Sequence, residues 1–143
     1  MTERQKEISK LLSSLPKEYN EGIRPASLEN IRSFRLKAKN KGIDKNIIEQ
    51  LADLYSVADN FMYEVVMGFH PCSSDIIFEW WNEKELWIGQ RDFNTLRWSN
   101  NKFCLGNASS ISYSKKNEYK TLVELIKGGI IEINELYENE KSR

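Results

Sequence analysis

Residues 44–69 read DKNIIEQLADLYSVADNFMYEVVMGF and contain the change from a helical to a strand pattern. In the first part, apolar residues recur every three or four positions, and Asp44 stands where a helix N-cap is expected. From Phe61 the spacing changes to two, among aromatic and β-branched residues that are typical of strands. A helical half therefore gives way to a sheet near residue 60. The predicted inner face of the helix consists of Ile47, Ile48, Leu51, Leu54, Tyr55 and Ala58.

Two further helices are predicted upstream. The first covers residues 3–14 and ends before Pro16, because proline cannot continue a helix. The second begins at the N-cap Ser27 and ends at Gly42, a residue suited to the position after a helix. Their inner faces are expected to hold Ile8, Leu11 and Leu12 in the first helix, and Leu28, Ile31, Phe34 and Ala38 in the second.

Short alternating segments after residue 60 predict an antiparallel meander. Asn100-Asn101 marks a tight turn within it. A C-terminal helix is expected over about 119–138, weakened or kinked at Gly128-Gly129. We therefore predict one α+β domain over residues 1–143, helical over 1–60 and a sheet over about 61–113. The expected strands include 75–81, 86–88, 95–98, 102–105 and 110–113.

Composition favours an ordinary soluble domain. The 143 residues include 21 Lys+Arg and 21 Asp+Glu, which gives a formal net charge of zero, and 40% of residues are hydrophobic. No apolar run reaches 18 residues, and the polar start MTERQKE lacks a signal-peptide core, so we expect a cytoplasmic protein with no membrane partner. In that compartment Cys72 and Cys104 are expected to be buried free thiols rather than a disulfide.

The chain has too few histidines and cysteines, and no suitable glycine motif, for several classes of enzyme. One histidine and two cysteines cannot form the common zinc sites, and the glycines match neither nucleotide-binding pattern. No cofactor and no metal are predicted. His70 and Cys72 could form a nucleophilic dyad, but Pro71 marks a turn there. We favour a histidine at the sheet edge and a small buried thiol.

Acidic and aromatic residues gather in residues 75–92. The segment holds five acids and two bases, Lys84 and Arg91, which gives a local net charge of −3. All four tryptophans lie within residues 80–98. One interpretation is a solvated sheet face above a core. The other is a patch that binds a basic protein partner through aromatic anchors. The acids are Asp75, Glu79, Glu83, Glu85 and Asp92, and the tryptophans are Trp80, Trp81, Trp87 and Trp98.

The partner-binding hypothesis names five residues. Either Trp81 or Trp87 is expected to be substantially exposed, with Glu83 and Glu85 projecting beside it and Asp92 completing the patch. Residues 24–45 carry seven cations against two acids, a local charge of +5. These cations spread around the predicted helix, so we expect a solvent-facing surface and no nucleic-acid partner.

The layout resembles the SUKH superfamily, which includes yeast cell-wall synthesis regulators and many bacterial immunity proteins. The resemblance covers most of residues 1–135. It departs at the early Leu-Pro-x-x-Tyr element, which no Asn-Gly-Gly turn follows here. The similar segments are Leu15-Pro16-Lys17-Glu18-Tyr19, Leu86-Trp87-Ile88-Gly89, Leu96-Arg97-Trp98 and the helix opened by Tyr119-Lys120-Thr121-Leu122.

This resemblance implies a non-enzymatic α+β domain that binds a protein, commonly an immunity protein that neutralises a toxin, often a nuclease. A nuclease toxin needs a basic surface to hold phosphates, so an inhibitor commonly offers acidic and aromatic side chains to it, as the patch at residues 75–92 would. Two alternatives stay open: a small hydrolase or ligand-binding enzyme that uses acidic residues of the sheet, and a regulatory scaffold protein.

Overall fold

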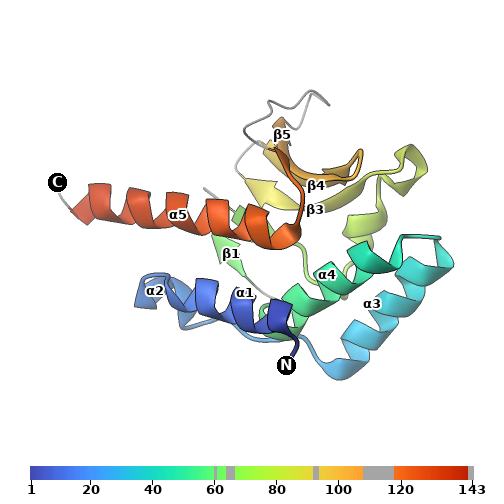
Figure 1. Ribbon diagram of the computed structural model, residues 1–143, viewed down its shortest axis with the longest axis horizontal. Helices are drawn as coiled ribbons and strands as arrows, with labels where there is room; N and C mark the ends of the chain where they lie inside the picture. Colours follow the sequence, from blue (N-terminus) through green and yellow to red (C-terminus); the bar gives the residue numbers. More distant parts are fainter. Residues whose placement is uncertain (60, 64–66, 92–93, 108–117, 142–143) are drawn as a thin grey trace.

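A computed structural model describes residues 1–59, 61–63, 67–91, 94–107 and 118–141, and it has the predicted single α+β domain (Figure 1). Within these described ranges, four α-helices precede the sheet and one follows it. The helices are α1 (Glu3–Ser13), α2 (Lys17–Asn20), α3 (Leu28–Asn40), α4 (Lys45–Val57) and α5 (Leu122–Lys141). The strands are β1 (Met62–Tyr63), β2 (Met67–Phe69), β3 (Leu86–Arg91), β4 (Asn94–Ser99), β5 (Lys102–Asn107) and β6 (Glu118–Tyr119), and two 3₁₀ helices, η1 (Asp75–Phe78) and η2 (Trp81–Glu83), lie between β2 and β3.

The N-terminal helices begin and end at the expected residues. The Thr2 hydroxyl accepts a hydrogen bond from the Gln5 N–H at the start of α1, within a capping box. The Ser27 hydroxyl caps α3, and the Asp44 carboxylate caps α4. Gly42 has a φ of 82°, the left-handed conformation that glycine adopts after a helix.

The sheet is an antiparallel meander in which each strand pairs with the next, in the order β1-β2-β3-β4-β5-β6. Asn100 and Asn101 both have positive φ, as the predicted tight turn between β4 and β5 requires. Gly89 allows β3 to approach β2 closely, because a Cβ there would lie 1.9 Å from the carbonyl oxygen of Gly68.

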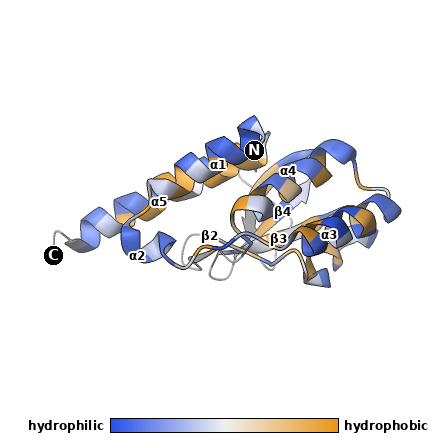
Figure 2. Cartoon of the chain, turned by 90° about the horizontal axis from the view of Figure 1, so that it is seen from below, coloured by the Kyte–Doolittle hydropathy of each residue, from blue (hydrophilic) through white to orange (hydrophobic). Residues whose placement is uncertain are grey.

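The helices pack on one side of the sheet (Figure 1). Helix α5 contacts β5 and β6 as well as α1, and α4 contacts α1 and α3, so one apolar core runs through all the layers. In Figure 2 the longer helices carry hydrophobic residues along one side and polar residues along the other. All six residues predicted for the inner face of α4 are buried.

Several predictions about local structure were wrong. Residues 75–81 form η1 and the start of η2 rather than a strand. Leu28 is exposed on α3, because it lies in the first turn and on the outer side of the helix. Helix α5 begins at Leu122 instead of residue 119, since Glu118–Tyr119 pair with β5 as β6. The predicted strand at 110–113 falls outside the described residues.

Helix α5 also runs through Gly128 and Gly129 without a break. These glycines let α5 pack closely on its neighbours. A Cβ at Gly128 would lie 2.7 Å from the Tyr119 hydroxyl, and a Cβ at Gly129 would lie 2.6 Å from the Met67 sulfur. The loss of intrinsic helix propensity is therefore offset by close packing that a larger residue would prevent.

Candidate protein-binding site

The acidic and aromatic segment forms a ridge between the sheet and α3, which we call the tryptophan ridge (residues 75–87). Its first turn begins where the Ser74 hydroxyl accepts a hydrogen bond from the Ile76 N–H. Ile77 and Phe78 are both buried although they are adjacent in sequence. A strand would point them to opposite faces, whereas this 3₁₀ turn, packed on β3, directs both inward.

A column of rings gives the ridge its rigidity. Trp80 stacks on Trp87 with ring centroids 4.2 Å apart and planes 8° from parallel. The guanidinium of Arg97 lies 4.1 Å from the Trp80 ring centroid, a cation–π contact, and His70 meets Trp87 edge-on at 5.1 Å. The Trp87 indole N–H donates to the Gly89 carbonyl.

Glu85 does not project toward solvent as predicted. Its carboxylate accepts a 2.7 Å hydrogen bond from Arg97, and the two side chains are only 13% and 6% exposed. Arg97 also donates to the Thr95 hydroxyl at 2.8 Å. Glu85 therefore neutralises a buried cation, a structural role that sequence spacing alone did not reveal.

The prediction that one tryptophan is substantially exposed was also wrong, since Trp81 and Trp87 are both partly buried. The Trp81 indole N–H donates to the Lys41 carbonyl at 2.9 Å, and its ring stacks on Trp98 at 6.4 Å. Lys84 lies 5.0 Å from the Trp81 ring centroid. Each tryptophan thus offers part of a fixed ring surface to solvent.

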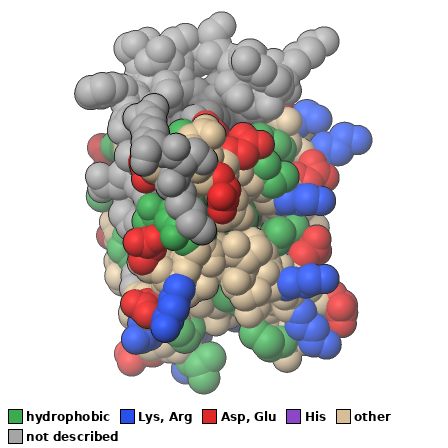
Figure 3. All heavy atoms as spheres, turned by 90° about the vertical axis from the view of Figure 1, so that its left-hand side faces the viewer, with side chains coloured by type: hydrophobic (Ala, Val, Ile, Leu, Met, Phe, Trp, Pro, Cys, Tyr) green, Lys and Arg blue, Asp and Glu red, His purple; other side chains and the backbone are tan. Residues whose placement is uncertain are grey.

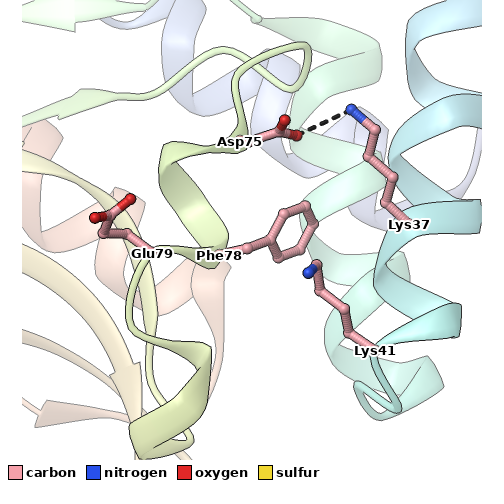
Figure 4. A pocket seen from close by; sticks show the side chains of 5 residues that line it. All are labelled: Lys37, Lys41, Asp75, Phe78 and Glu79. Carbon is pink, nitrogen blue, oxygen red and sulfur yellow. Dashed lines mark hydrogen bonds and ion pairs between the residues drawn. The ribbon is translucent and has the colours of Figure 1, made fainter.

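Helix α3 lies directly beside the ridge and reduces its negative charge. Lys37 pairs with Asp75 at 2.9 Å, and the Lys41 ammonium sits 5.2 Å from the Phe78 ring centroid. These four residues and Glu79 line an open pocket of about 440 Å³ (Figure 4). Figure 4 shows the Glu79 carboxylate pointing away from Asp75, so the two acids do not converge as a hydrolytic pair would.

Among the predicted acids, Glu79 and Glu83 are the ones found exposed and without an ion pair to another described residue. Asp92 lies outside the described residues. Within the part of the chain that is described, no three His, Cys, Asp or Glu side chains are placed to hold a metal ion.

His70 and Cys72 do not have the properties of a nucleophilic dyad. Burial and the neighbouring Asp59 carboxylate raise the pKa of the Cys72 thiol to about 12, so the thiolate is scarcely formed at neutral pH. Burial lowers the pKa of His70, whose Nε2 is buried and has no hydrogen-bond partner in the described structure. Cys72 and Cys104 are both free and buried, as predicted.

Arg97 and the outer face of α5 were missed by the sequence analysis. Arg97 lies between Leu96 and Trp98 in a predicted strand, and a cation between two apolar residues of a strand is normally exposed. On α5, Ile131 is 51% exposed and stands outside the buried stripe of Leu125, Ile126, Ile130 and Ile133. The exposure of Ile131 was predictable from the sequence, because it directly follows Ile130 of that stripe and successive helix residues point in different directions.

Comparison with known proteins adds no relative: no family model, curated protein or solved structure matches the chain. No helix in the described ranges is long and apolar enough to span a bilayer. The candidate site therefore rests on its own geometry.

Proposed function

We propose that this chain is a non-enzymatic protein-binding domain of the immunity type, which neutralises a basic toxin domain by covering part of its surface. The tryptophan ridge is the proposed binding surface. The observation that carries the proposal is the fixed set of partly exposed rings, Trp80, Trp81 and Trp87, with the exposed carboxylates of Glu79 and Glu83 on the same ridge.

Rigid rings reduce the entropic cost of binding. Trp87 is fixed by stacking on Trp80 and by its indole hydrogen bond, and Trp81 is fixed by the Lys41 carbonyl. Little side-chain freedom is left to lose when a partner covers them. Tryptophan is also among the residues that most often dominate interface energies.

The two exposed glutamates would act mainly on the rate of association. Charges at the rim of an interface steer a partner of opposite sign and contribute less to the lifetime of the complex. Glu79 and Glu83 can provide such steering, whereas Glu85 is occupied by Arg97.

The test begins with the gene immediately upstream. If that gene encodes a toxin-like C-terminal domain, co-expression of this chain should restore growth of the host cell, and the purified proteins should form a complex. The double variant Glu79→Lys/Glu83→Lys should slow association by about tenfold or more at low salt. Glu3→Lys/Glu7→Lys, which reverses two exposed acids on α1, is the control with the same change in net charge and should leave the rate nearly unchanged.

Failure of the chain to protect against the neighbouring toxin-like domain would contradict the proposal. So would equal association rates for the double variant and the control, since the ridge would then not be the binding surface. A scaffold that binds host proteins through the same ridge would give ridge-dependent binding without protection.

A further inference from the structure

Helix α3 carries two unusually exposed leucines on its outer side. Leu28 is 80% exposed and Leu36 is 60% exposed. They are eight residues apart, about 12 Å along the helix, and at 100° per residue they share one face with Arg32 and Lys39. Neither cation forms an ion pair within the described part of the chain. We call Leu28, Arg32, Leu36 and Lys39 the leucine stripe.

Helix α5 has a surface of complementary character. Ile131 is 51% exposed at an open hollow of about 550 Å³. We call the surface the acidic hollow. Its lining residues among those described are Ile131, Asn134, Glu135, Glu138 and Asn139. Figure 3, which faces the end of the molecule where α5 finishes, shows carboxylates beside apolar side chains.

The two surfaces cannot meet within one molecule. Figures 1 and 2 both place α3 and the C-terminal half of α5 at opposite ends of the long axis. A second copy can bring them together, with apolar side chains in the centre and Arg32 and Lys39 facing Glu135 and Glu138. We propose that this chain self-associates head to tail, the leucine stripe of one copy docking in the acidic hollow of the next.

The occupant is a second copy because the match covers both apolar character and charge sign, and because the net charge is zero, so copies do not repel one another overall. One helix face against one hollow is smaller than a standard interface of about 800 Å² per partner, so the contact is weak and concentration-dependent. Different surfaces meet, so the contact is heterologous and extends into chains or rings.

Sedimentation velocity from about 10 μM to about 1 mM tests the proposal, because this span covers weak dissociation constants. At about 50 mM NaCl the mean mass should rise with concentration above the 16.8 kDa monomer, and about 500 mM NaCl should lower it by screening the charges. A chain that stays monomeric over this whole range overturns the proposal. Co-sedimentation of such a monomer with phosphatidylserine vesicles would assign the basic helix to a membrane surface instead.

Two variants identify the surfaces. Leu28→Ser/Leu36→Ser changes only the stripe, and Ile131→Ser changes only the hollow. Each should be monomeric alone, and an equimolar mixture should give a 1:1 dimer and nothing larger, because one intact stripe and one intact hollow remain. Ile76→Ser, a 41% exposed isoleucine outside both surfaces, is the control and should associate as the unmodified chain does.

These positions are exposed, so the variants should fold, and amide NMR spectra establish that they do. A mixture that remains monomeric contradicts head-to-tail docking. Continued association of either single-surface variant also contradicts it, since a contact between identical faces would then be responsible.

Discussion

Glu85→Lys should destabilise the protein strongly and Glu83→Lys hardly at all, although the two glutamates are only two residues apart. Glu85 pairs with the buried Arg97 at 2.7 Å, whereas Glu83 is exposed. Glu85→Lys removes the only ion pair described for Arg97 and places a second cation beside it. Breaking a buried pair in this way costs about 3–5 kcal/mol, a large part of the total stability of a domain.

For a chain of this size, that cost lowers the melting temperature by roughly 10–15 °C. Glu83→Lys should change the free energy of unfolding by less than about 0.5 kcal/mol, as exposed substitutions usually do. Calorimetry or urea denaturation monitored by tryptophan fluorescence measures both. Glu85→Gln, which keeps the shape of the side chain, separates the effect of its charge from the effect of its volume.

A double-mutant cycle with Glu85→Gln and Arg97→Met isolates the pair. Removing both partners should cost less than the sum of the single changes, with a coupling of about 1–3 kcal/mol. If Glu85→Lys melts within about 2 °C of Glu83→Lys, Arg97 is not the buried and dependent cation described here, and the assignment of a structural role to Glu85 is wrong.

Three further outcomes are expected. Gly89→Ala should cost at least about 2 kcal/mol in urea denaturation, because its Cβ would lie 1.9 Å from a backbone oxygen of β2, whereas Gly22→Ala, with nothing within 4 Å, should cost far less. Burial lowers the pKa of His70 in the folded chain, so as the pH falls the unfolded chain binds a proton at this histidine before the folded chain does. The free energy of unfolding should therefore fall as the pH drops through 6.5, and His70→Gln should flatten that dependence. Both thiols are buried and the pKa of Cys72 is about 12, so Ellman's reagent at pH 8 should label neither Cys72 nor Cys104 in the folded chain. Both should react in urea, and rapid labelling of the folded chain would contradict the described burial.

The helices were predictable because local and tertiary preferences agree there. Ser27, Gly42 and Asp44 are each in the position that their backbone chemistry favours, and the apolar spacing matches the face that the core buries. The Asn100-Asn101 turn was predictable for the same reason, since a positive φ at two successive residues strongly favours asparagine and glycine.

Residues 75–81 were mispredicted as a strand because their pattern fits two structures. Apolar and polar residues alternate as in a strand, but a serine precedes an acid and an apolar run, which is also a helix-start signal. Packing against β3 decides between them. The burial of Arg97 depends on Glu85 and Trp80 approaching it from another segment, and no local pattern carries that information.

The consequence for function is that the ridge is much less acidic than its sequence indicates. Asp75 is paired with Lys37, and Glu85 is paired with Arg97. Glu79 and Glu83 remain, with Lys84 beside them, which leaves a net charge of about −1 where the sequence counts −3. The native ridge therefore attracts a basic partner only modestly, and the slow association expected of Glu79→Lys/Glu83→Lys comes from reversing the ridge charge to about +3. The lifetime of a complex on this ridge would depend on the fixed tryptophan rings more than on charge.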